Sequence, residues 1–258
     1  MRLPSALITV LLAAGLAGCG GDGGTPEPTP VPTSASAPAP ESRSEFAGLA
    51  ALALDRRYAA LYSLESGGAT REVVAAVAED GAWRVDIPAG ALGGTAGVTI
   101  IRVATGLYQC TLSTPSAPIS PTCVRVAERG DKVPRKYDPR VQRLFRQWLP
   151  VFTDRKAPLA VSAVKPLAGV QGSCYAVDSV TAALDQPVDV GIYCYAPDGL
   201  LTAARVDFGQ LKLVRQVAGP KTLQLPGPEV AGEPMGMSAP PPAAGPTVSA
   251  PAGPSPSA

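Results

Sequence analysis

The sequence predicts an α+β domain built mainly from antiparallel β-strands, with one strong amphipathic helix. Short apolar segments recur between residues 45 and 230, and several alternate apolar with polar side chains, as half-buried strands do. Turn sequences such as Ser66-Gly67-Gly68 and Pro197-Asp198-Gly199 separate them, so the connections are short and consecutive strands should run antiparallel. Residues 138–152 follow helical periodicity instead.

The clearest strand is the segment in which Trp83, Val85 and Ile87 alternate with Arg84 and Asp86 before Pro88. The other expected strands are residues 58–65, 71–78, 98–104, 107–112, 159–164, 173–180, 188–194, 200–208 and 211–217, with residues 223–225 closing the domain. Such a meander indicates a sheet of sequence neighbours.

The expected helix begins at Asp138, a good N-cap, and has Pro139 at its first helical position. Its apolar side chains share one face, and they are Val141, Leu144, Phe145, Trp148, Leu149 and Phe152. Pro150 should mark or kink its last turn. A weaker helix is expected at residues 46–54.

The N-terminus has the pattern of an export signal. Arg2 is followed by an apolar run of about eleven residues, too short for a bilayer that needs roughly 20. The run ends in Leu16-Ala17-Gly18-Cys19, which resembles the lipobox of bacterial lipoproteins. We therefore expect cleavage before Cys19, lipid such as palmitate on its thiol, and an extracytoplasmic protein anchored to the cell membrane. An ordinary secretory signal is the alternative.

Composition divides the chain into four parts. Residues 1–18 are the expected signal peptide, and residues 19–44, rich in Gly, Pro and Ser, are an expected disordered tether. Residues 45–230 suit a single β-rich domain. Residues 231–258, rich in Pro and Ala, are an expected disordered tail.

The charges and the missing histidine exclude several functions. The 22 Lys and Arg residues balance 21 Asp and Glu residues, which argues against nucleic acid as a partner. Because the chain has no histidine, His-dependent triads and His-ligated zinc sites are excluded. We expect no cofactor and no metal site.

The cysteines indicate two disulfides. Once Cys19 is assigned to lipid, Cys110, Cys123, Cys174 and Cys194 remain, an even number in an exported chain. Three connectivities are open. We favour Cys110–Cys123 and Cys174–Cys194, because each pair brackets one short hairpin or loop. A four-thiolate metal site is the competing interpretation, although the chain has no CxxC pair.

The chain offers no convincing catalytic motif, so we expect that it is not an enzyme. Ser162-Ala163-Val164-Lys165 matches an SxxK pattern, but the match lies in an expected strand and lacks its companion motifs. The apolar face of the expected helix, which we call the stripe, could instead cover an apolar cavity. The alanine pairs Ala59-Ala60, Ala75-Ala76 and Ala203-Ala204 would give the sheet beneath it small side chains that leave space unfilled. A plain core helix is the simpler interpretation.

A family resemblance rests on three segments. They are the lipobox at Cys19, the turn and strand Asp80-Gly81-Ala82-Trp83-Arg84-Val85, and Asp198-Gly199 with the strands through Leu213. Together with the architecture of residues 45–230, they resemble the LolA-like lipoproteins of high-GC Gram-positive bacteria, nearest to the LppX/LprG group. The resemblance implies a strongly bent sheet or half-open barrel, with one or two helices on its concave face and acyl chains held beneath them.

The first functional hypothesis is therefore a membrane-tethered lipoprotein that binds or carries a hydrophobic, lipid-like ligand in the cell envelope. The second is a non-enzymatic protein-interaction lipoprotein with a solid core. The third is a hydrolase acting through carboxylates or through Ser162 and Lys165. The cysteine pairs and the long Pro/Ala tail depart from the family pattern.

Overall fold

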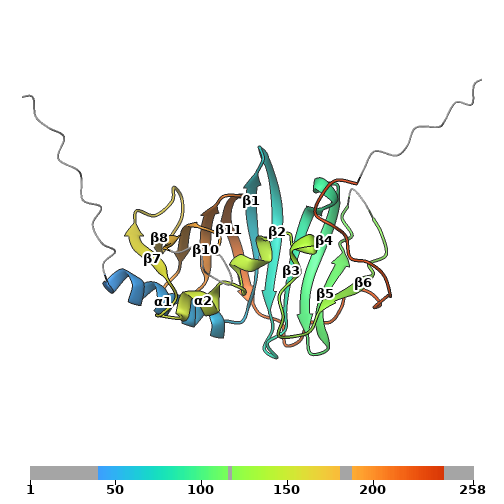
Figure 1. Cartoon of the computed structure of the whole chain (residues 1–258), viewed down its shortest axis with the longest axis horizontal. Helices are drawn as coiled ribbons and strands as arrows, with labels where there is room; N and C mark the ends of the chain where they lie inside the picture. Colours follow the sequence, from blue (N-terminus) through green and yellow to red (C-terminus); the bar gives the residue numbers. More distant parts are fainter. Residues whose placement is uncertain (1–39, 116–117, 181–187, 241–258) are drawn as a thin grey trace, which may run out of the picture. The chain divides into compact units, whose positions relative to one another are not determined.

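The computed structural model describes residues 40–115, 118–180 and 188–240 of the chain. In this part an eleven-stranded sheet has the order β6-β5-β4-β3-β2-β1-β11-β10-β9-β8-β7 (Figure 1). The strands are β1 Tyr58–Ser66, β2 Ala69–Val77, β3 Trp83–Ala91, β4 Ala96–Val103, β5 Gly106–Thr111, β6 Cys123–Ala127, β7 Leu159–Val164, β8 Ser173–Ser179, β9 Gly191–Tyr195, β10 Leu201–Val206 and β11 Gly209–Ala218. The α-helices are α1 Pro40–Asp55 and α2 Leu149–Thr153.

Two meanders meet in the middle of the sheet. The first runs from β1 outward to β6 and the second from β7 inward to β11, and every adjacent pair of strands is antiparallel. The strands that come first and last in the chain, β1 and β11, pair with each other in the middle of the sheet, with Tyr58 opposite Ala218 and Glu65 opposite Gln210. The mainly antiparallel fold class is confirmed. The sheet is not closed, because β6 and β7 lie at opposite ends of its strand order.

One face of the sheet, which we call the inner face, carries the main core. Along β1 every second side chain from Tyr58 to Leu64 is buried, whereas Ala59, Leu61 and Ser63 are partly exposed on the outer face. The helices and the segment 128–158 pack on the inner face. In Figure 1, α1 and α2 lie against the part of the sheet formed by β7 to β10.

The expectation of one helix over residues 138–152 is wrong. The segment forms the 3₁₀ turn Val141–Leu144 and the five-residue helix α2. Asp138 Oδ1 accepts a 2.8 Å hydrogen bond from the backbone N–H of Arg140, whose φ of 69° is not helical. Pro150, which lacks an N–H, stands in the first turn of α2 rather than in a last turn. The apolar side chains of the segment are buried as their spacing predicts, but the backbone bond to Asp138 and the proline divide it into two short elements.

The longest described helix is α1, with 16 residues. The sequence predicted only a weaker, shorter helix here, at residues 46–54. It begins at Pro40, so the domain starts before the expected boundary at residue 45. Its last turn lies against the β9–β10 turn, where a Cβ on Gly199 would come 2.5 Å from the backbone nitrogen of Ala53. Only glycine fits this close contact.

The domain also extends past residue 230. Met235 and Met237 pack against the main core, and Leu92 and Gly93 donate backbone hydrogen bonds to Gly236 and Met237 at 2.9 Å. Residues 1–39 and 241–258 lie outside the described residues. They hold Cys19 with the expected signal peptide, most of the expected tether and most of the expected tail.

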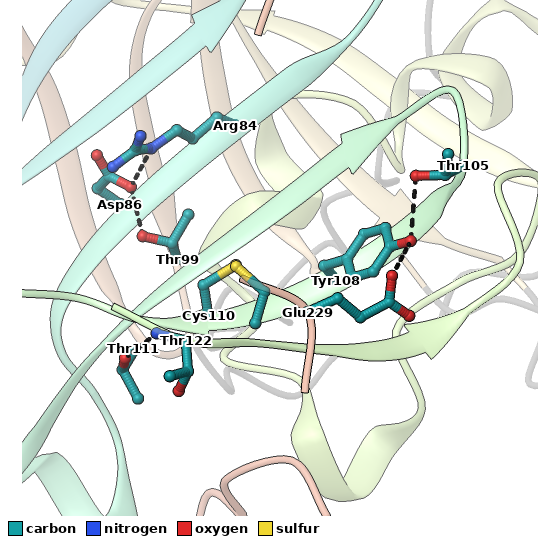
Figure 2. Close-up of a disulfide and its surroundings, with 10 residues drawn as sticks. Arg84, Asp86, Thr99, Thr105, Tyr108, Cys110, Thr111, Thr122 and Glu229 are labelled. Carbon is teal, nitrogen blue, oxygen red and sulfur yellow. Dashed lines mark hydrogen bonds and ion pairs between the residues drawn. A yellow bond between two sulfur atoms is a disulfide. The ribbon is translucent and has the colours of Figure 1, made fainter. Parts of the chain in front are cut away.

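The outer face is covered at both ends of the sheet. Residues 219–230 cover β4 to β6, where Leu223 and Leu225 pack on a cluster around Cys110 and Cys123. Figure 2 shows this region, in which the Tyr108 hydroxyl donates a 3.1 Å hydrogen bond to Glu229 Oε2 and lies 3.1 Å from the Thr105 hydroxyl. At the other end, Leu167 and Val170 cover a cluster around Cys174 and Cys194.

Both disulfides of the sequential connectivity are present, each between directly opposed residues of neighbouring strands. Cys110 and Cys123 join β5 to β6, and Cys174 and Cys194 join β8 to β9. Because each bond lies beneath one of the two covering segments, each is buried. Among the described helices, none is both long and apolar enough to span a membrane.

Candidate functional site

The six side chains expected to roof a cavity lie in the main core. Val141, Leu144, Phe145, Trp148, Leu149 and Phe152 are each between 0% and 4% exposed. The space beneath them holds other rings. Phe46 lies 4.8 Å from Phe152, Phe152 lies 5.0 Å from Tyr193, and Phe145 lies 5.0 Å from Tyr62, measured between ring centroids. The stripe therefore completes a filled core.

The sequence pattern did not predict that Phe46 fills the core beneath Phe152. It comes from α1 and also contacts Tyr175 and Tyr195, at 5.3 and 6.0 Å. A signal for its burial exists in the sequence. Phe46, Ala50 and Ala53 recur at helical spacing and are 0%, 0% and 7% exposed. The small alanines let the helix approach the sheet closely, which brings the phenyl ring into the space expected to be empty.

A cleft of about 440 Å³, which we call the polar cleft, lies beside the segment 138–152. Trp148 is the residue of the stripe that lines it. Its centre is Asp189, whose side chain is 4% exposed. Asp189 Oδ2 accepts a 2.8 Å hydrogen bond from Trp148 Nε1, and Oδ1 accepts one of 2.5 Å from Arg140. Asp207, which is 63% exposed, binds the same guanidinium at 2.6 Å.

Asp138 is the second buried carboxylate of this cleft, with a side chain 2% exposed. It accepts hydrogen bonds from Gln142 Nε2 at 2.6 Å and from Arg143 Nε at 2.8 Å, besides the backbone bond from Arg140. Burial opposes the charge of Arg140, but its hydrogen bonds to Asp207 and Asp189 outweigh that cost and raise its pKa. The pairs of Arg140 connect the segment 138–148 to Asp189, just before β9, and to Asp207, just after β10.

The arrangement gives the buried carboxylates a positioning role. A general acid or base must reach a substrate proton, yet Asp138 and Asp189 are already bound by arginine and amide donors. In the residues that the structure describes, no group of three or more Cys, Asp and Glu side chains is arranged to hold a metal ion.

Ser162 and Lys165 are not brought together as an SxxK dyad requires. Ser162 lies in the strand β7 with an exposed side chain, and Lys165 directly follows that strand. In an extended chain, residues three apart point to opposite faces. A helical turn, which would place both on one face, is not formed there.

Within the described residues, an apolar area on the outer face lies uncovered between the two covered ends. We call it the outer strip, and it consists of Ala59, Leu61, Val74, Ala76 and Val217. The pairing of Leu61 with Val74, and of Ala59 with both Ala76 and Val217, puts these side chains on one face. Val74 is 39% exposed and Val217 is 64% exposed.

Comparison with known proteins gives no family assignment. No family profile and no curated protein sequence matches the chain. Among solved structures, the crystal structure of MucB is similar at 14% sequence identity and a TM-score of 0.38. The match covers 77% of this chain and 65% of the MucB chain, so this chain spans less than two thirds of that protein. A similarity of this size assigns neither a fold family nor a function.

Proposed function

We propose that this protein is a cell-envelope lipoprotein, anchored through lipid on Cys19, whose sheet domain is a non-enzymatic protein-interaction module. The observation that carries the proposal is the filled core: Phe46 occupies the space beneath Phe152 in which an acyl chain was expected. A domain with that interior recognises partners at its surface. The carboxylates of Asp138 and Asp189 are already paired with arginines, which supports a structural role for the polar cleft.

The LolA-like class remains part of this proposal. An open antiparallel sheet with helices on one face is the arrangement that the family resemblance implies. The proposal departs from the carrier hypothesis at one point. In the family pattern the helices enclose acyl chains, whereas here α1 and the segment 141–152 fill that space with their own aromatic rings.

The outer strip is the surface we propose for the partner. Cross-strand neighbours make it continuous over β2, β1 and β11, and it lies between the segments that cover both ends of the outer face. Small apolar side chains on a sheet give a flat surface that another protein can cover. Arg215 lies on the same face as Leu61 and adds a charge at the border of the strip.

The test is site-directed photocrosslinking of the full lipoprotein in cells. A photoreactive amino acid at Val74 or Val217 is expected to trap one and the same partner protein. The matched control position is Leu52 of α1, which is 49% exposed and lies away from the strip, and no partner is expected there. Equal trapping at all three positions contradicts the strip as the interface.

A second measurement separates the interaction module from a carrier. The purified full-length protein is extracted with organic solvent, and the extract is analysed by mass spectrometry. The proposal expects no lipid beyond the acyl chains attached to Cys19. One released lipid per protein would overturn the filled-core interpretation.

A further inference from the structure

A second cleft, of about 220 Å³, lies on the inner face of the sheet near β3, β4 and β5. Its floor is a row of cross-strand neighbours, because Trp83 pairs with Arg102 and Arg102 pairs with Leu107. Its remaining lining comes from the segment 130–151, which contributes Gln142 and Arg146. We call it the arginine cleft.

Three residues that line the arginine cleft carry buried polar atoms without hydrogen-bond partners. Within the described residues, the buried side-chain atoms that lack a hydrogen bond include Trp83 Nε1, Arg102 Nε and Gln142 Oε1. All three residues line this cleft, and Trp83 and Gln142 are 7% and 1% exposed. A buried polar group without a partner is costly, so a ligand that met these atoms after small side-chain movements would stabilise the site.

The charges in the cleft are also unbalanced. Arg102, Lys132 and Arg146 line it together with the single carboxylate of Asp131. In the part of the chain that the structure describes, none of these three cations forms an ion pair. The Arg102 guanidinium donates to the backbone carbonyl of Gly81 and lies 5.7 Å from the centroid of the Trp83 ring, and the Arg146 guanidinium donates to the backbone carbonyl of Leu54.

The environment penalises both guanidinium charges. Burial lowers the pKa of Arg146, and the neighbouring charge of Arg102 lowers it further. Burial likewise lowers the pKa of Arg102, with Arg129 adding to the effect. An anion between the two would stabilise both charges. This contrasts with Arg140 and Arg143 in the polar cleft, which are each held by carboxylates.

We propose that the arginine cleft binds a small organic oxyanion that also carries a hydrogen-bond donor and an apolar group, as an N-acyl amino acid or the C-terminal residue of a peptide does. The guanidiniums of Arg102 and Arg146 bind the carboxylate. Small side-chain movements would bring the shielded indole N–H of Trp83 to the carboxylate and Gln142 Oε1 to the ligand's amide N–H, since Nε2 of Gln142 already donates to Asp138. Leu107, Val133 and Val151 contact the apolar group.

In the polar cleft, by contrast, the buried carboxylates of Asp138 and Asp189 are paired with arginines. The arginine cleft goes beyond the proposed interaction module, because it faces inward while the outer strip lies on the opposite face of the sheet. The two proposals can therefore fail separately.

The test is a calorimetric titration of the full-length protein with N-acetylphenylalanine. Its neutral relative, N-acetylphenylalaninamide, keeps the ring and the donor but lacks the carboxylate, and inorganic phosphate has the charge without the ring. We expect saturable binding of N-acetylphenylalanine with a dissociation constant below about 1 mM. Both relatives should bind at least about 10-fold more weakly.

The variants Arg102→Gln and Arg146→Gln should each weaken binding about 10-fold or more. Arg155→Gln, at an exposed position that follows α2 and does not line the cleft, is the matched control and should bind as the original protein does. Circular dichroism shows whether each variant is folded. If one arginine variant misfolds, binding by the other variant still tests the proposal. Binding of the amide as tight as that of the acid, no binding of the acid, or unchanged binding by a folded arginine variant overturns the proposal.

Discussion

Trp148 Nε1 donates a 2.8 Å hydrogen bond to Asp189 Oδ2, which fastens the segment between β6 and β7 to the residues that lead into β9. Both side chains are nearly fully buried, with Trp148 2% exposed. The same carboxylate binds Arg140 and lies 3.6 Å from Arg143. One acidic side chain thus joins an aromatic core residue to two arginines.

Replacing Asp189 with Ala should destabilise the protein by about 3–5 kcal/mol, because the buried partners lose their counterion and acceptor. Asp207→Ala is the matched control, since Asp207 binds the same Arg140 but is 63% exposed. It should cost no more than about 1 kcal/mol. Urea denaturation of both variants gives the two free energies of unfolding. Similar losses in both variants would contradict the special role of Asp189.

Phe46→Ala tests the filled core. Removing a fully buried phenyl ring should cost about 3–5 kcal/mol and leave a cavity among Phe152, Tyr175 and Tyr193. The exposed Leu52 of the same helix provides the control, and Leu52→Ala should change stability by less than about 0.5 kcal/mol. Benzene should raise the melting temperature of Phe46→Ala but not of the original protein, as apolar cavities bind such ligands. Stabilisation of the original protein by benzene would reveal an existing cavity.

The sheet could be predicted from the sequence because turns and alternation are local signals. Trp83, Val85 and Ile87 are buried while Arg84 and Asp86 are half-buried, as their alternation requires. The sequence also predicted burial of the stripe from Val141 to Phe152. It did not reveal that Asp138 would capture the N–H of Arg140 and stop a helix, which depends on a competing side-chain hydrogen bond.

The filled core and the arginine cleft depend on contacts between distant parts of the chain. Phe46 and Phe152 are 106 positions apart in the numbering, so no window of sequence shows that one ring covers the other. Trp83, Arg102 and Leu107 become neighbours through strand register. Arg146 lies in the cleft, on the stretch between the 3₁₀ turn Val141–Leu144 and α2, where the expected helix is divided.

Cys19→Ala tests the anchor. Without the thiol that carries lipid, the protein should lose incorporation of labelled palmitate and should leave the membrane fraction. Cell fractionation and detergent phase partitioning measure both effects. Ser5→Ala, which changes the signal region but keeps Cys19, should stay lipidated. Unchanged membrane association of the Cys19 variant would mean that another part of the chain holds the protein there.

The two disulfides should stabilise the domain by similar amounts. Their cysteines are 13 and 20 positions apart, and the chain-entropy estimate for loops of this size is roughly 3 kcal/mol each. The paired variants Cys110→Ala/Cys123→Ala and Cys174→Ala/Cys194→Ala should each lose about that much in urea denaturation. Addition of reductant should lower the stability of the original protein and leave a variant without all four cysteines unaffected.

Buried tyrosines should make the protein sensitive to alkali. Burial, as the largest cause, raises the pKa of Tyr58 to about 12 and raises the pKa values of Tyr62, Tyr193 and Tyr195 as well. The folded state therefore keeps these protons at a pH where the unfolded chain, with its ordinary tyrosine pKa near 10, has lost them. Since the folded state binds more protons, its stability is retained below pH about 10 and falls as the pH rises toward about 12.

A spectrophotometric titration should show one group of tyrosines that ionises only as circular dichroism reports unfolding. Tyr58→Phe should shift that unfolding to higher pH, whereas Tyr137→Phe, on a partly exposed ring, should leave it unchanged. Ionisation of all tyrosines before unfolding would contradict the sealed aromatic core.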